Sequence, residues 1–149
     1  MAVDTKVIER VITIEAPPDA VFRLLTDPVQ YVRWKGELAE LEPRPAGKYR
    51  VTFAGDYGTA AGKFVEVVPN RRVVFTWGWE GNENVPPGTS TVEIDLEPQG
   101  KGTRLRLVHR GLPEAEIKTH ADGWDFFLPR LEDVAEGREP RQAPTTEKE

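Results

Sequence analysis

Two histidines, His109 and His120, are the side chains of this sequence best suited to proton transfer near neutral pH. His109 ends a stretch of alternating apolar residues, and His120 follows soon after in an amphipathic stretch, so we expect the two imidazoles to lie close together. In a half-apolar interior, one imidazole is suited to orienting a ligand carbonyl or to acting as a general base. A histidine that bonds the backbone near the turn at 111–113 is the more common arrangement, and we favour it.

No other group is placed by its spacing to complete a catalytic set. Glu66 is the best candidate carboxylate because it lies on an otherwise apolar stretch, although a surface or bulge position suits it better. Ser90 is the only serine, and it is not part of a G-x-S-x-G turn. We therefore assign no catalytic residue and lean against an enzyme.

The composition excludes several classes of site and partner. The sequence contains no cysteine, which excludes disulfides and thiolate metal sites and favours a cytoplasmic location. With two histidines and no H-x-x-H or H-E-x-x-H spacing, we expect no metal ion and no cofactor. The formal net charge of −5 argues against nucleic-acid binding. No apolar run approaches the roughly 18–20 residues of a membrane span, so we expect no membrane insertion.

Alternating apolar and polar residues predict antiparallel strands separated by turn signals. The predicted strands cover residues 6–16, 47–53, 57–69, 71–79, 89–98 and 103–110, with a weaker edge strand at 36–43. Prolines followed by apolar residues at helical spacing predict two short helices, at 17–25 and 26–34. Acidic residues of 89–98 beside basic residues of 103–110 indicate ordinary cross-strand ion pairs on the solvent face.

A long C-terminal helix is predicted to begin near Glu114, with one broad apolar face. Gly123 and Pro129 fall on its outer half. Pro129 leaves the carbonyl of Asp125 without an intrahelical partner, at a cost of about 3 kcal/mol in an unaided helix, and predicts a bend toward the apolar face. Such a helix suits the closure of an internal cavity. We expect one domain over 1–137 and a disordered tail over 138–149.

Four blocks in this order carry a family resemblance: residues 14–34, 69–81, 90–113 and 120–137. They resemble the START-like (SRPBCC, helix-grip, pollen-allergen-like) superfamily, in particular the branch related to the C-terminal domain of the activator of heat-shock-protein-90 ATPase. The resemblance implies an α+β helix-grip fold, in which a curved antiparallel sheet of about six or seven strands holds the long helix over a cavity. One departure is Trp34-Lys35, where the family often has Trp-Trp, and this changes the expected mouth of the cavity.

Members of the superfamily bind lipids, polyketides and other hydrophobic molecules in that cavity. Candidate ligand contacts are the residues that parity in the strands and spacing in the last helix place there, together with Trp34, which we expect to close one end. These are Trp34, Phe53, Phe64, Phe75, Trp77, Leu107, His109, His120, Trp124 and Leu128. For most of them simple core packing is the better interpretation. Trp77 and Trp124 favour a pocket, because a buried indole N–H needs a partner that a ligand or a water supplies.

Three functions are consistent with these observations. The first is a ligand-binding module for a small hydrophobic molecule such as a lipid or an aromatic polyketide. The alternative is a protein-interaction or co-chaperone module with a chaperone or another protein as partner. The third is an enzyme of the cyclase or dehydratase type, which needs two ionisable groups converging inside the cavity.

Overall fold

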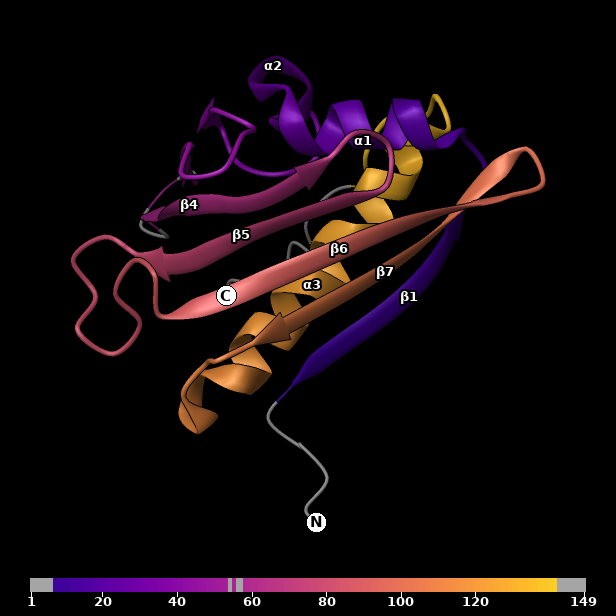
Figure 1. Cartoon of the computed structure of the whole chain (residues 1–149). Helices are drawn as coiled ribbons and strands as arrows, with labels where there is room; N and C mark the ends of the chain where they lie inside the picture. The colour runs from indigo at the N-terminus through magenta and orange to yellow at the C-terminus, as the bar shows by residue number, and fades with distance from the viewer. Residues whose placement is uncertain (1–6, 54, 56–57, 142–149) are drawn as a thin grey trace, which may run out of the picture.

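The structure, a computed structural model, describes residues 7–53, 55 and 58–141. The elements follow the order β1 (Ile8–Ile14), α1 (Pro18–Thr26), α2 (Pro28–Tyr31), β2 (Leu38–Leu41), β3 (Lys48–Thr52), β4 (Thr59–Val68), β5 (Arg72–Trp79), β6 (Ser90–Gln99), β7 (Gly102–Arg110) and α3 (Glu114–Ala135). Figure 1 shows α3 crossing one face of the sheet, with α1 and α2 at one end.

All strands pair antiparallel in a single seven-stranded sheet of order β1-β7-β6-β5-β4-β3-β2. The predicted α+β class and antiparallel sheet are therefore confirmed, and the weak stretch at 36–43 contains the edge strand β2. The register of β6 with β7 pairs Val92 with His109 and Ile94 with Leu107. This register places the apolar side chains of both strands on the face covered by α3.

The two short helices begin where the prolines predict. Pro18 and Pro28 each occupy the first turn of a helix, where a missing N–H costs no hydrogen bond. The Asp27 side chain caps α2 by accepting from the backbone N–H groups of Val29 (2.9 Å) and Gln30 (3.3 Å). The helix ends at Tyr31, and the following turn carries Trp34 into the core.

The helix α3 runs without interruption through Pro129, which lies inside it. Its buried residues include Trp124, Leu128 and Leu131, which face the sheet. Contacts outside the core also hold the helix in place. Arg10 of β1 pairs with Asp125 at 2.6 Å, and the side chain of Glu136, just beyond α3, accepts from the backbone N–H of Glu15.

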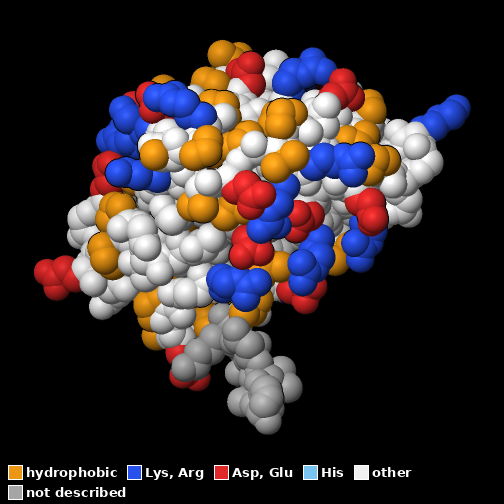
Figure 2. Space-filling model, viewed as in Figure 1, with side chains coloured by type: hydrophobic (Ala, Val, Ile, Leu, Met, Phe, Trp, Pro, Cys, Tyr) orange, Lys and Arg blue, Asp and Glu red, His pale blue; other side chains and the backbone are white. Residues whose placement is uncertain are grey.

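The outer face of the sheet carries interspersed acidic and basic side chains (Figure 2). Arg72 contacts Asp95 (2.8 Å) and Glu66 (2.9 Å), and Arg110 contacts Glu93 (3.2 Å). The predicted cross-strand ion pairs are thus present. Glu66 lies exposed beside a β-bulge, as the surface interpretation of that residue expects.

The chain beyond α3 folds back onto the helix end. Arg138 and Arg141 both donate to the Asp133 carboxylate, at 2.9 and 2.7 Å, so that carboxylate is buried although helical spacing predicts an exposed position for it. Of the tail predicted to be disordered, residues 138–141 are described and residues 142–149 lie outside the described residues. Within the described part of the chain, no helix has the length and apolar character needed to cross a membrane.

Candidate functional site

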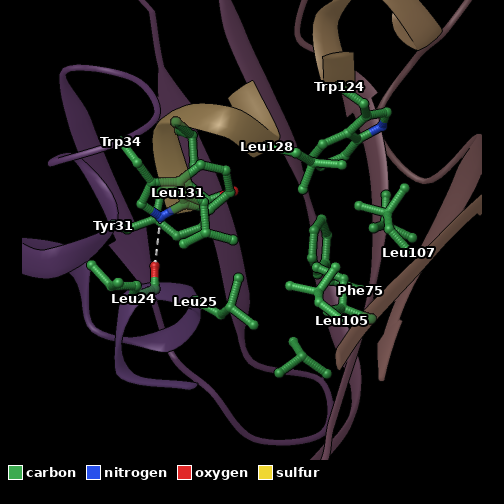
Figure 3. Close-up of a cluster of buried hydrophobic side chains, with 14 of the residues drawn as sticks. Leu24, Leu25, Tyr31, Trp34, Phe75, Leu105, Leu107, Trp124, Leu128 and Leu131 are labelled. Carbon is green, nitrogen blue, oxygen red and sulfur yellow. Dashed lines mark hydrogen bonds between the residues drawn. The ribbon is translucent and has the colours of Figure 1, made fainter. Parts of the chain in front are cut away.

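The residues predicted to contact a ligand lie together between the sheet and α3. Nine of the ten are buried, and Phe53 is half-buried. Figure 3 shows the middle of this interior, where side chains of α3 face those of β5 and β7. Phe64 and Phe75 pack around Tyr49, whereas Trp77, Trp124 and the two histidines form a second cluster.

His109 is held as a neutral imidazole by a chain of hydrogen bonds. The indole N–H of Trp124 donates to Nδ1 (3.0 Å), so the proton of the ring resides on Nε2, which contacts the Ser90 hydroxyl at 2.8 Å. Ser90 in turn donates to the carbonyl of Trp77 (3.0 Å). Burial is the main cause that lowers the pKa of His109 to about 3, with smaller contributions from His120 and Lys35.

His120 is also engaged at both ring nitrogens. Its ring lies 5.7 Å from that of His109, which confirms the expected proximity. Nε2 accepts from the indole N–H of Trp79 (3.1 Å), and Nδ1 lies 2.8 Å from the carbonyl of Glu116, to which it donates. Burial lowers its pKa, partly offset by that carbonyl. Since all four imidazole nitrogens have partners, neither histidine offers a free base in this structure.

The tryptophans differ in how their N–H groups are satisfied. Trp34 donates to the carbonyl of Leu24 (2.8 Å), the bond drawn as a dashed line in Figure 3. Trp124 and Trp79 donate to histidines, as described above. Trp77 is the exception: its Nε1 is buried and has no acceptor among the described residues. A buried donor without a partner is uncommon in folded proteins and needs an explanation.

Lys35 lies in the same interior and is only 3% exposed. It follows α2 in a tight turn, where its backbone N–H donates to the carbonyl of Tyr31 (3.1 Å). The next residue, Gly36, has φ +82°, and a Cβ built on it would lie 2.5 Å from Val51. The turn therefore needs glycine at this point. It leads the chain out to β2 and leaves the Lys35 side chain inside.

The amine of Lys35 is surrounded by aromatic rings, a set that we call the aromatic cage. Nζ lies 4.0 Å from the ring centroid of Trp124 and 4.4 Å from that of Trp77. The rings of Phe127, Trp34, Tyr31 and Phe53 complete the cage at 5.7–6.0 Å. Aromatic faces attract a cation but are no substitute for a hydrogen-bond acceptor.

Burial alone lowers the pKa of Lys35 well below its usual value of 10.5. Within the described residues, no carboxylate pairs with the amine and no side chain accepts from it. The other buried titratable groups nearby add no negative charge, because both histidines are neutral and the pKa values of Tyr31 and Tyr49, whose hydroxyls bond each other, are raised by burial. Burial in this interior thus favours the uncharged form of the amine over the ammonium form.

Two pockets open to solvent outside the sheet–helix interior: one lies on the outer face of the sheet around Arg72 and Arg104, and the other lies beside α1 around Arg23 and Gln30. Neither is lined by a predicted ligand contact. The half-exposed ring of Phe53 packs against those of Trp79 and Phe127, which are also half-exposed, and the three rings form the solvent side of the interior.

Sequence reasoning did not identify Lys35 as a site residue. Periodicity has no bearing on a single polar residue in a turn, so no pattern predicts that its side chain points inward. The available signal was the family resemblance, because Lys35 occupies the place where relatives often carry a second tryptophan. A position that favours a large apolar side chain is an interior position.

The seven-stranded antiparallel sheet and the long helix lying across it define a helix-grip protein of the START-like superfamily. The chain belongs to the family described as Activator of Hsp90 ATPase homolog 1-like protein, whose model matches residues 15–136. The predicted resemblance is therefore confirmed.

Individual relatives support the same assignment. An AHSA1-like protein from Rhizobium etli is 51% identical, with a TM-score of 0.72 over 93% of this chain and 86% of that one. DynU16, from the dynemicin biosynthetic locus, is 26% identical, with a TM-score of 0.77 over 91% of this chain and 49% of that one. An uncharacterised protein from Schizosaccharomyces pombe is 25% identical over 76% of this chain, which spans about a third (32%) of that protein.

Proposed function

We propose that this protein binds a small hydrophobic molecule between the sheet and α3. The observation that carries the proposal is the indole N–H of Trp77, a buried donor without an acceptor among the described residues. An aromatic interior with a few polar groups is typical of small-molecule sites. A molecule with an oxygen acceptor supplies the missing bond, and the relative DynU16 from a biosynthetic locus is consistent with such a ligand.

Entry of a ligand requires side chains to move, because nine of the ten predicted contacts are buried. Phe53, Trp79 and Phe127 are the half-exposed rings of that interior, so they are the groups that a ligand displaces first. Pockets of this kind are minor conformations that a ligand makes dominant, and the binding free energy includes the cost of opening them.

The test is a thermal-shift screen of fatty acids, sterols and aromatic polyketides, together with native mass spectrometry of freshly purified protein. Two matched variants, Trp77→Phe and Trp34→Phe, lose the same side-chain volume. Only Trp34→Phe leaves a buried carbonyl unpaired, so it should be the less stable of the two by about 1–3 kcal/mol.

The two variants should rank in the opposite order when the stabilisation by a bound ligand is compared. Stabilisation by a ligand should decrease in Trp77→Phe, which has lost the free donor, and persist in Trp34→Phe. A protein that purifies empty and that no hydrophobic compound stabilises would contradict the proposal.

A second candidate function, protein interaction of the co-chaperone type, is favoured by two exposed apolar side chains. Val29 of α2 is 72% exposed and Leu38 of the edge strand β2 is 68% exposed. The two elements contact each other, and β2 has a free edge suited to pairing with another chain. If this function is correct, the protein changes the ATP hydrolysis rate of Hsp90, and Leu38→Glu abolishes the change while leaving ligand-dependent stabilisation intact.

A further inference from the structure

We propose that Lys35 is the polar anchor of the interior site, and that the site selects a hydrophobic carboxylic acid over its uncharged analogues. The inference rests on the proposed function and specifies the chemistry of its ligand. Three features of the interior carry it, each stated for the described residues: the position of the Lys35 amine, which none of them pairs with a carboxylate, the indole N–H of Trp77, to which none of them offers an acceptor, and the absence of a competing anion.

The first feature is the position of the amine. Lys35 approaches the cage from the turn after α2, and its Nζ lies within 4.4 Å of the ring centroids of both Trp77 and Trp124. The amine is a donor in either protonation state, and it finds no acceptor among the described residues. A buried polar group in this condition is stabilised by any ligand that brings an acceptor.

The second feature is the indole N–H of Trp77, which belongs to one of the two rings closest to Nζ. The site therefore presents two donors and needs acceptors. A carboxylate has two acceptor oxygens and no donor, so it matches this pair of groups. An amide or an alcohol also forms hydrogen bonds with these groups, but it carries no negative charge and so cannot form the ion pair that a carboxylate forms with the protonated amine.

The third feature is the charge of the surroundings. His109 and His120 are neutral and fully hydrogen-bonded, and the hydroxyls of Tyr31 and Tyr49 bond each other. The closest aromatic faces also favour a cation at Nζ. The negative charge of an anion that enters is therefore neutralised by one group alone, the amine of Lys35. The amine becomes an ammonium ion when it takes a proton.

The protonation step balances as follows. A carboxylic acid that enters as the neutral acid transfers its proton to the amine and forms a carboxylate–ammonium pair. When the ligand enters as the carboxylate anion, the amine takes one proton from the solvent. Near neutral pH most hydrophobic acids are ionised in water, so binding takes up a proton from the buffer.

The experiment is titration calorimetry with matched probe pairs, decanoic acid with decanol and naphthylacetic acid with naphthylethanol. Each pair is titrated in two buffers that differ in ionisation enthalpy, which reports proton uptake. We expect the acid to bind about tenfold or more tightly than the alcohol, as hydrogen bonds to a charged group imply, with proton uptake for the acid alone.

Lys35→Met is the decisive variant, because methionine fills a similar volume without a polar head. It should lose both the acid preference and the proton uptake while still binding the alcohols. Lys63→Met, at an exposed position of β4, is the matched control and should behave as the unsubstituted protein.

The outcomes separate the two proposals. Equal affinity for acid and alcohol without proton uptake, or an acid preference that survives in Lys35→Met, overturns the role of Lys35 and leaves hydrophobic binding intact. Absence of binding for every probe and every compound of the wider screen overturns both.

Discussion

The amine of Lys35 lowers the stability of the folded protein, because it is buried and no described residue offers it an acceptor. In the unfolded chain the same amine is fully hydrated and charged. If Lys35 is the binding group proposed above, it opposes folding and contributes favourably only when a ligand is bound. Such a trade of stability for function is common at sites that hold polar groups ready for a ligand.

Lys35→Met should therefore stabilise the ligand-free protein by roughly 1–3 kcal/mol near neutral pH. The unfolded chain holds the Lys35 proton up to a pH near 10.5, whereas the folded chain releases it at a lower pH. Between these two pH values the unfolded state binds more protons, so the stability of the unsubstituted protein rises with pH. The advantage of the variant should shrink as the pH approaches 10.5, which urea unfolding at several pH values measures.

A variant that is less stable than the parent at pH 7, or a stability difference that does not change with pH, would contradict this account. The Lys63→Met control should show no such pH dependence, because that side chain lies on the solvent side of β4.

At the scale of elements, α3 is anchored in its middle and near its C-terminal end. Arg10 of β1 pairs with Asp125 in its middle, and Arg130 donates to the carbonyl of Trp34 beside the cage. Beyond the helix, Arg138 and Arg141 enclose the Asp133 carboxylate, and their hydrogen bonds lower its pKa below its usual value of 3.8. These contacts hold the part of the helix that covers the sheet.

Asp133→Asn should destabilise the protein by about 1–2 kcal/mol at neutral pH, since the charged hydrogen bonds are lost while the position stays buried. A carboxylate with a lowered pKa contributes stability above pH 3.8, and that contribution is lost as the pH falls below it. The difference between variant and parent should thus narrow in acid, as thermal unfolding between pH 3 and pH 7 would show.

Asp125→Asn provides the comparison, because its partner Arg10 is on the surface and the Asp125 side chain is 53% exposed. Screening by solvent limits such a pair to less than about 1 kcal/mol. If the two substitutions cost the same, enclosure of Asp133 by the two arginines is not the reason for its effect.

Alternation and helical spacing were enough to predict the elements, because each strand has one apolar face and each face has a period of two. Nine of the ten predicted interior residues are buried, and Phe53 is half-buried. Lys35 and Asp133 were not predictable in this way. The first is buried by a turn that Gly36 makes possible, and the second by side chains that fold back from beyond the helix.

At the scale of the whole molecule, the sheet is open, with β1 and β2 as its edge strands. The strands differ in how extensively they pair with their neighbours. β6 and β7 lie inside the sheet and pair along most of their length, whereas β2 has four residues and one neighbour. α1 and α2 cover one end of the molecule (Figure 1), and Lys35 follows α2 in the chain. A ligand between sheet and α3 contacts segments that are distant in sequence.

Hydrogen exchange should reveal both the weaker pairing of β2 and the segments that a bound ligand contacts. Amides of β2 should exchange faster than those of β6 and β7 in the free protein, because an edge strand opens with fewer lost bonds. A bound hydrophobic acid should slow exchange in the turn at 32–37 and in the middle of α3, and should leave the 99–102 hairpin unchanged. Uniform slowing across the whole chain would indicate global stabilisation without a contact at the cage.

All four tryptophans of the sequence lie on the same interior, with Trp34, Trp77 and Trp124 buried and Trp79 half-buried against Trp77. Their light emission therefore reports on this interior alone, without background from indoles elsewhere on the surface. Entry of a molecule, or a charge appearing on the amine between Trp77 and Trp124, must change the intensity or colour of that emission. The tryptophans thus serve as an intrinsic fluorescent probe of this interior, and candidate ligands can be screened by fluorescence with no dye attached.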